Sequence, residues 1–384
     1  MSQLPPQLTV CAACREPLEP ADNFCGRCGA DLSAVPPAPD RTGPVLLRGA
    51  EDYSLAPPAG AVPAQTAQGR DGTGGTGASG RPCGGCRSGM IDKDGYCEHC
   101  GHAQPRERDH MEHESAGAAA VSDRGLRHHR NEDAYAVATA ELPDGGPAVI
   151  AVVSDGVSSA ARPDEASAAA TATACEALTA DLARGEQPRE ATHRAIVRAA
   201  EAVSALAAPG RPGHSERLRH ENAPACTIVS AVITGDLLTI GWVGDSRAYW
   251  VPDDRSTQPA RLTEDDSWAA QMVAAGLMSE AEAYADERAH AITGWLGADA
   301  YEVEPHTASY HPDRPGVVLV CSDGLWNYAE SAEQMADIVP ADARARPLEC
   351  ARRLLAHALD GGGHDNVTVA VLPFPERPHG AGSA

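Results

Sequence analysis

The stretch AVVSDGVSS, residues 151–159, joins a short apolar run to a Ser-Asp-Gly turn, and VLVCSDGLW, residues 318–326, repeats this arrangement. Apolar runs of this length, bounded by turn residues, predict buried β-strands. A third aspartate, Asp365, stands just before the apolar run VTVAVL, and a fourth, Asp133, stands just before AYAV. The pattern therefore raises the question of whether four carboxylates at strand ends meet in the folded chain.

Further β-like runs surround these two stretches: PAVIAVVS, CTIVSAVI, LLTIGWVG, GVVLVCS and NVTVAVL. Two long alanine-rich segments, roughly 164–185 and 188–207, carry apolar residues at steps of three and four, which predicts helices. Strands gather on either side of the helix pair. The order predicts an α+β domain in which antiparallel sheets are covered by helices.

The whole chain has 384 residues and a formal net charge of −23. Such a charge disfavours nucleic acid as the main partner, because binding to the phosphate backbone requires lysine and arginine. No apolar run approaches the length of a membrane helix, and MSQLPPQ lacks the start of a signal peptide. We therefore expect a cytoplasmic protein that binds no membrane, whose cysteines are reduced thiols or metal ligands.

Eight cysteines form two matched groups, in each of which two C-x-x-C pairs are separated by ten residues. Two such pairs predict a four-thiolate structural zinc site, whereas a redox pair would need one C-x-x-C beside a βαβ unit. The pattern resembles a double zinc ribbon, which implies a docking or regulatory module with a protein partner. The two zinc ions are assigned to Cys11, Cys14, Cys25 and Cys28, and to Cys83, Cys86, Cys97 and Cys100.

His99 or His102 replacing one thiolate of the second group is the alternative left open. The other four cysteines lie in apolar surroundings and are expected to be buried core thiols: Cys175, Cys226, Cys321 and Cys350.

The domain boundaries follow from shifts in composition. Segments rich in Pro, Gly and Ala cannot bury enough apolar surface to offset their chain entropy and are expected to be flexible. The expected order is zinc ribbon 1 (1–30), disordered linker (31–82), zinc ribbon 2 (83–102), linker (103–120), the main domain (121–374) and a disordered tail (375–384).

Carboxylates brought together in a low-dielectric cleft repel one another and stay ionised only when cations join them. Magnesium and manganese prefer such all-oxygen sites, and a glycine after the aspartate lets a backbone carbonyl approach as a ligand. The alternative is that an Asp-Gly pair such as Asp155-Gly156 or Asp323-Gly324 is only turn chemistry. For a single Asp-Gly pair, turn chemistry would be the better explanation. It does not explain the whole ordered set of motifs.

The ordered motifs resemble those of the metal-dependent Ser/Thr protein phosphatases of type 2C (the PPM family) over about 121–374. They are RGLRHHRNEDAYAV, VVSDGVSSAA, GDSRAYW, LTEDDSW, ITGWLG, VLVCSDGLWNY and GGHDNVTVAVL. The resemblance implies a four-layer α-β-β-α sandwich of two antiparallel sheets, with residues 266–291 as a flap beside the active site. It also implies hydrolysis of phosphoserine and phosphothreonine in phosphorylated protein substrates of a signalling system, where two manganese or magnesium ions activate a bridging water for in-line attack.

Site residues follow from the same resemblance. Asp155 matches the aspartate that bridges both metals, and Gly156 the glycine whose carbonyl binds one of them. Asp323 and Asp365 match the carboxylates that complete the other ion. The remaining matches are Glu132 and Asp133, the acidic pair that holds metal-bound waters, and Asn366 of the Asp-Asn motif. Asp245, in the GDSR turn, is expected to be structural.

Three positions depart from the family pattern. His128 stands where the family usually has a phosphate-binding arginine, and it could still donate a hydrogen bond to phosphate. Val157, Ser158 and Ser159 follow Asp155-Gly156, so no histidine is available there as a general acid. Ala223 stands where bacterial relatives often have the aspartate of a third metal, so a third ion is doubtful, although Asp265 could bind one weakly.

These departures leave a second hypothesis open beside the active phosphatase. It is a weakly active or inactive phosphatase-like binding protein that docks through its zinc ribbons. A third is a two-metal hydrolase of another phosphorylated compound.

Overall fold

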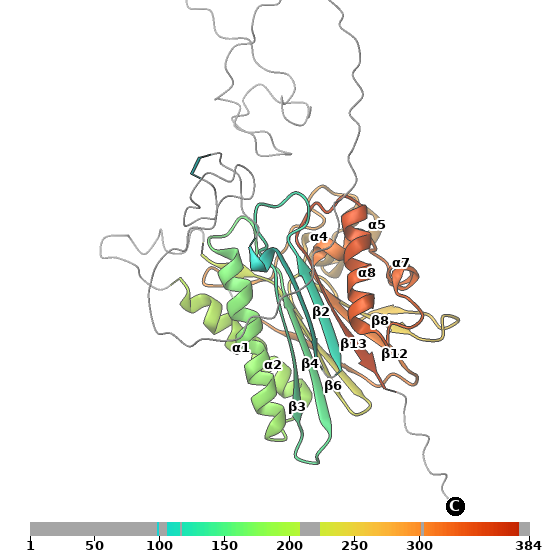
Figure 1. Cartoon of the computed structure of the whole chain (residues 1–384). Helices are drawn as coiled ribbons and strands as arrows, with labels where there is room; N and C mark the ends of the chain where they lie inside the picture. Colours follow the sequence, from blue (N-terminus) through green and yellow to red (C-terminus); the bar gives the residue numbers. More distant parts are fainter. Residues whose placement is uncertain (1–97, 100–105, 116, 208–222, 301–302, 376–384) are drawn as a thin grey trace, which may run out of the picture. The chain divides into compact units, whose positions relative to one another are not determined.

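The computed structural model describes residues 98–99, 106–115, 117–207, 223–300 and 303–375 (Figure 1). The chain divides into two units, Met1–Thr76 and Gly77–Ala384, and every described residue belongs to the second. The eight cysteines assigned to zinc, the linker 31–82 and residues 376–384 of the predicted tail lie outside the described residues.

Two antiparallel sheets form the centre of the domain. The six-stranded sheet has the order β1 (His110–Ser115), β2 (Ala118–Asp123), β13 (Val367–Phe374), β12 (Gly316–Cys321), β8 (Arg247–Pro252) and β9 (Ala260–Arg261). The five-stranded sheet has the order β11 (His306–Tyr310), β7 (Leu237–Val243), β6 (Ile228–Thr234), β4 (Pro147–Ser154) and β3 (Ala134–Glu141). A further pair consists of β5 (Ala225–Cys226) and β10 (Leu296–Gly297).

The helices flank these sheets (Figure 1). The five-stranded sheet packs against α1 (Pro163–Ala183) and α2 (Pro188–Ala205). The six-stranded sheet packs against α7 (Ala332–Ile338) and α8 (Pro347–Asp360). The remaining helices are η1 (Glu107–Asp109), α4 (Trp268–Ala274), α5 (Glu280–Tyr284) and α6 (Asp323–Trp326).

The alternation of side chains along β4 explains why its whole run is apolar. Ile150 and Val152 pack with the helices α1 and α2, whereas Ala151 and Val153 face the second sheet. Successive side chains of a strand point to opposite faces, so a strand between two buried layers is apolar at every position. The same division holds for β12 and β13. The predicted four-layer arrangement of helices and two antiparallel sheets is thus what the structure has.

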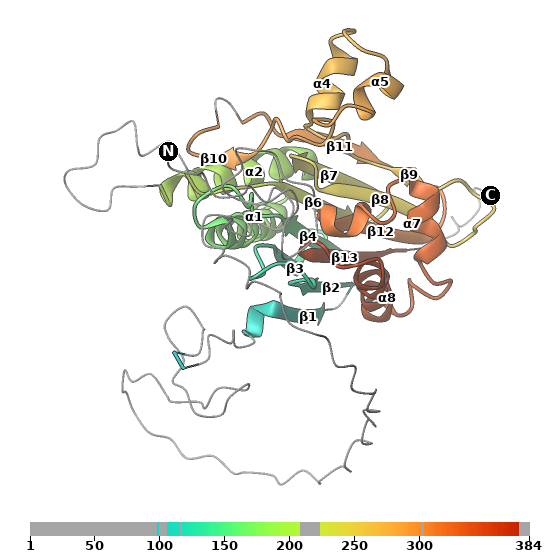
Figure 2. The ribbon, with the colours of Figure 1, turned by 90° about the horizontal axis from the view of Figure 1, so that it is seen from above.

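The predicted flap, residues 266–291, contains α4 and α5, which project from the sandwich (Figure 2). Ser267 and Ser279 cap these two helices by accepting hydrogen bonds from backbone amides of the first turn. A small cluster of Ala269, Ala283 and Ala289 holds them together. Because this core is so small, the flap has little apolar packing of its own.

One boundary differs from the prediction. Residues 110–115 and 118–120, assigned above to a linker, form β1 and the start of β2. The first strand reads HMEHES and is mostly exposed, and the second begins with three small alanines that are fully buried. β1 and the first half of β2 lack the large branched side chains that mark a strand in sequence.

The four cysteines of the main domain are free thiols. Cys226, Cys321 and Cys350 are buried, as predicted, and Cys175 is half-buried. Burial raises the pKa of Cys226 and of Cys350 to about 12. These thiols are therefore part of the core. In the part of the chain that the structure describes, no helix is both long and apolar enough to span a bilayer.

Candidate active site

The register of the five-stranded sheet brings the first two aspartates together. Ala134, which begins β3, pairs with Ser154, which ends β4. Asp133 and Asp155 are the next residues outward on the two strands, one before β3 and one after β4. Antiparallel pairing therefore places their backbones side by side at one end of the sandwich.

The six-stranded sheet positions the other two aspartates, Asp323 and Asp365. Cys321, at the end of β12, pairs with Val369 near the start of β13. Asp323 begins the short helix α6 after β12, and Asp365 precedes β13. A close approach joins the two segments at Gly324, where an added Cβ would lie 1.8 Å from the carbonyl oxygen of Asn366. Only glycine allows this contact between the turn after Asp323 and the Asp365-Asn366 pair.

The four carboxylates are close enough to affect one another's ionisation. Burial and the charges of the other three raise the pKa of Asp155 well above its ordinary value. Burial, and then Asp365 and Asp323, raise the pKa of Asp133. Burial and Asp365 raise the pKa of Asp323. Like charges raise one another's pKa only at short range, so the strand ends form one acidic cluster, which we call the carboxylate cluster (Asp133, Asp155, Asp323 and Asp365).

Two oxygens of the carboxylate cluster are buried without a partner. Asp133 is fully buried, and its Oδ2 accepts a hydrogen bond of 2.8 Å from the hydroxyl of Ser322. Its Oδ1, and Oδ1 of Asp323, accept no hydrogen bond from any described residue. A buried carboxylate oxygen without a donor is costly. These two oxygens therefore have the environment expected of groups that bind a cation.

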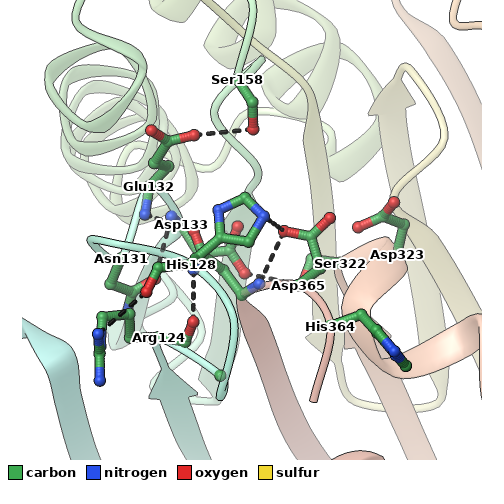
Figure 3. Close-up of polar contacts among 12 residues, drawn as sticks. Arg124, His128, Asn131, Glu132, Asp133, Ser158, Ser322, Asp323, His364 and Asp365 are labelled. Atoms are coloured by element: carbon green, nitrogen blue, oxygen red, sulfur yellow. Dashed lines mark hydrogen bonds and ion pairs between the residues drawn. The ribbon is translucent and has the colours of Figure 1, made fainter. Parts of the chain in front are cut away.

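Asp365 also contacts the imidazole of His128. The Nε2 atom of His128 lies 3.0 Å from Oδ1 of Asp365, and the Asp365 side chain is 40% exposed (Figure 3). Among the described residues, no three acidic, histidine or cysteine side chains close around a single point as metal ligands do. The chemistry of the donors nonetheless fits hard divalent cations, because the converging groups are carboxylates, and those of Asp133 and Asp323 each have a raised pKa and an unpartnered oxygen.

Glu132 has partners outside the carboxylate cluster. Its Oε1 accepts a hydrogen bond of 2.7 Å from Arg130. Its Oε2 accepts one of 2.8 Å from the hydroxyl of Ser158, as Figure 3 shows. Its backbone N–H donates to Oδ1 of Asn366 at 2.6 Å. Asn366 in turn donates from its side chain to the carbonyl oxygens of Arg124 and Arg130. Ser158, a departure noted in the sequence, thus helps to orient Glu132.

Asp245 belongs to the same region although its turn was expected to be structural. It is 8% exposed, and burial followed by the charges of Asp323 and Asp265 raises its pKa. Its carbonyl oxygen also accepts a hydrogen bond of 2.9 Å from the indole of Trp326, which is a supporting contact. The residue that sequence reasoning set aside is therefore a fifth carboxylate beside the cluster. Its position just after an apolar run, LLTIGWV, was the signal that could have revealed it.

The two residues considered for a third ion have other surroundings. Ala223 is buried and its side chain offers no oxygen. Both carboxylate oxygens of Asp265 accept hydrogen bonds from Arg247, at 2.6 Å from Nη2 and 2.9 Å from Nε. The carboxylate of Asp265 is thus engaged in a buried ion pair, which argues against the weak third site suggested above.

Comparison with known proteins places these features in a family. A family model described as "Protein phosphatase 2C" matches residues 124–359, more than half of the chain. The serine/threonine protein phosphatase PstP of Mycobacterium tuberculosis is 33% identical over 157 residues, which is 40% of this chain and 28% of PstP. The serine/threonine phosphatase stp of Listeria innocua is 31% identical over 151 residues, 39% of this chain and 57% of that protein. The chain thus spans between about a quarter and three fifths of these relatives.

A solved structure agrees over the described domain. The crystal structure of the M. tuberculosis serine/threonine phosphatase PstP superposes with a TM-score of 0.52 at 28% identity, covering 67% of this chain and 98% of the solved one. The motifs, the two helix-flanked sheets and the carboxylate cluster between them agree with the family match. The chain therefore belongs to the protein phosphatase 2C family.

Proposed function

We propose that the chain is a metal-dependent protein serine/threonine phosphatase whose substrates are phosphorylated proteins. The observation that carries this proposal is the carboxylate cluster, in which two buried oxygens lack a donor among the described residues. Membership of the protein phosphatase 2C family supports it, as does the naming of PstP and of Listeria stp as serine/threonine phosphatases.

Two manganese or magnesium ions would be held by Asp155, the carbonyl of Gly156, Asp323 and Asp365. Carboxylate and carbonyl oxygens are the ligands that these ions prefer. When bound, the ions would lower the pKa of a water and neutralise charge on the phosphate. Their charge would also counteract the raised pKa values of Asp133, Asp155 and Asp323, because an adjacent cation lowers a carboxyl pKa.

Hydrogen bonds from neighbouring residues would position the acidic pair Glu132 and Asp133. The hydroxyl of Ser322 occupies one oxygen of Asp133 and leaves the other for a water in the site. Glu132 would act with Asp133 on such waters, and its orientation depends on Arg130 and Ser158. Asn366 fixes the backbone of Glu132 from the opposite sheet. The acidic pair is therefore oriented by hydrogen bonds from the chain's own residues.

The decisive experiment is an assay with a phosphoserine peptide over a manganese titration. We expect turnover that rises with manganese and is lost when EDTA removes it, together with binding of two ions per chain by calorimetry. A protein that binds two manganese ions and releases no phosphate would instead support the binding-protein hypothesis. Turnover of small phosphate esters without turnover of the peptide would favour a hydrolase of another phosphorylated compound.

His128 is proposed to donate a hydrogen bond to the substrate phosphate from its place beside Asp365. Replacing His128 with alanine is expected to raise KM for a phosphoserine peptide about tenfold or more, the effect of losing one charge-assisted hydrogen bond. His128→Arg should keep KM near the original value. Steady-state kinetics checks this, and the neighbouring exposed His129 provides the control, since His129→Ala should leave KM unchanged. An unchanged KM in His128→Ala would exclude the role.

We further propose that the two cysteine groups hold one structural zinc ion each and dock a protein partner, and that the protein works in the cytoplasm. Elemental analysis of the full chain is expected to find two zinc ions. Cys11→Ser and Cys83→Ser should each lose one, because a four-thiolate site needs all its ligands. Cys175→Ser, which removes a half-buried core thiol, should lose none. A full chain without zinc would refute this.

A further inference from the structure

A small cavity opens next to the backbone that carries Asp155. Its volume is about 270 Å³. This is below the usual range of about 300–1,000 Å³ for small-molecule sites, and it suits one large amino-acid side chain. Among the described residues, its lining includes Val157, Ala160, Ala223, Ile292, Trp295 and Asp299.

The two-residue strand β5 links this cavity to the carboxylate cluster. On one side of β5, the backbone N–H of Thr227 donates to the carbonyl of Asp155 at 2.8 Å, and that of Val157 donates to the carbonyl of Ala225 at 3.0 Å. On the other side β5 pairs with β10, which lies between Trp295 and Asp299 in sequence. Neighbouring strands are separated by about 4.8 Å, so β10 lies about 10 Å from the Asp155 backbone.

The lining combines apolar residues with one serine, Ser159, and one acidic residue. Of the described lining residues, Asp299 is the one with a charged side chain. Its Oδ1 accepts a hydrogen bond of 3.0 Å from the indole nitrogen of Trp295. Gly297 lies beside both groups, since an added Cβ would lie 2.9 Å from Oδ1 of Asp299 and 3.2 Å from Cδ1 of Trp295. The carboxylate and the indole are therefore held together at this cavity.

We propose that this cavity binds an arginine side chain of the substrate, two or three residues from the phosphoserine; the proposal rests on the phosphatase function above. An arginine stem suits apolar walls, and its guanidinium pairs with a carboxylate and stacks on an indole. An extended peptide advances about 3.3–3.6 Å per residue, so two or three residues span the distance from the carboxylate cluster. An acidic side chain would meet Asp299 with the same charge and is excluded.

The test compares phosphoserine peptides that carry arginine, alanine or glutamate at the second and third positions on either side. With manganese and the wild-type chain, we expect kcat/KM for the best arginine peptide to exceed that of its alanine counterpart about tenfold, mainly through KM. The glutamate peptide should be the poorest. Equal values for the three peptides would overturn the proposal. No turnover of any peptide would instead contradict the phosphatase function itself.

Variants then assign the preference to Asp299, with the ratio between arginine and alanine peptides measured within each protein. Asp299→Asn should reduce the ratio to about one, and Asp299→Lys should favour the glutamate peptide. Asp299 is exposed, so these changes are compatible with folding. Asp360→Asn removes a matched exposed charge at the end of α8 and should retain the full ratio. A retained ratio in Asp299→Asn would place arginine recognition elsewhere.

Discussion

Replacing Asp155 with asparagine is expected to reduce kcat with a phosphoserine peptide by about a thousandfold. This side chain is proposed to bind both metal ions. Such ions supply several kcal/mol of transition-state stabilisation, and each 1.36 kcal/mol lost lowers the rate about tenfold. Asparagine retains the size of aspartate and removes the charge. Phosphate release at saturating manganese measures the effect, and activity within tenfold of the wild type would contradict the bridging role.

The same variant has a second consequence that separates lost ligation from lost folding. Burial and the neighbouring carboxylates raise the pKa of Asp155, so the ionised group destabilises the metal-free fold. In EDTA, Asp155→Asn should therefore have a melting temperature equal to or above that of the wild type. Manganese should raise the melting temperature of the wild type and have much less effect on the variant, because binding stabilises the native state by mass action. A lower melting temperature in EDTA would show that the substitution damages the fold.

Replacing Arg247 with methionine is expected to cost about 3–5 kcal/mol of unfolding free energy, the usual result of removing one partner of a buried ion pair. Arg247 is fully buried, pairs with Asp265, and places its guanidinium carbon 3.6 Å from the centroid of the Trp326 ring. The substitution leaves the carboxylate of Asp265 buried without its cation. Chemical denaturation of the metal-free protein measures the loss.

Two comparisons test that explanation. Adding Asp265→Asn to Arg247→Met should recover part of the stability, because the uncompensated charge is then gone. Arg288→Met is the matched control: Arg288 also lies over an indole, that of Trp268, and pairs with Asp286, but its side chain is 63% exposed. It should leave the denaturation midpoint nearly unchanged. Equal losses in Arg247→Met and Arg288→Met would show that burial of the pair is not the cause.

The elements that could be predicted from the sequence are those with a strong local signal. The run PAVIAVVS coincides with β4, and the two alanine-rich segments correspond to α1 and α2, each of which starts at a proline. By contrast, β1 is polar and the first half of β2 is alanine, so their strand character comes from pairing with β13 and with each other. Tertiary pairing decides such segments, and a local pattern does not contain it.

The candidate site was likewise predictable only in part from the sequence. Asp155 and Asp323 were recognisable because each follows an apolar run, and the structure brings both into one cluster. The partners of Glu132 and the contact of His128 with Asp365 depend on loops that meet only in the folded domain. Asp245 was assigned a supporting turn role because its motif suggests one, and its burial beside Asp323 became visible only from the packing.

The long-range hydrogen bond between Glu132 and Asn366 has a consequence for biosynthesis. The two residues are 234 positions apart, and Asn366 precedes β13, which lies between β2 and β12 in its sheet. A ribosome adding about 5–20 residues per second takes at least ten seconds to make the intervening chain. During that interval the earlier acidic residues exist without Asp365 and Asn366. The nascent domain therefore acquires its complete acidic centre only after β13 has been made and inserted.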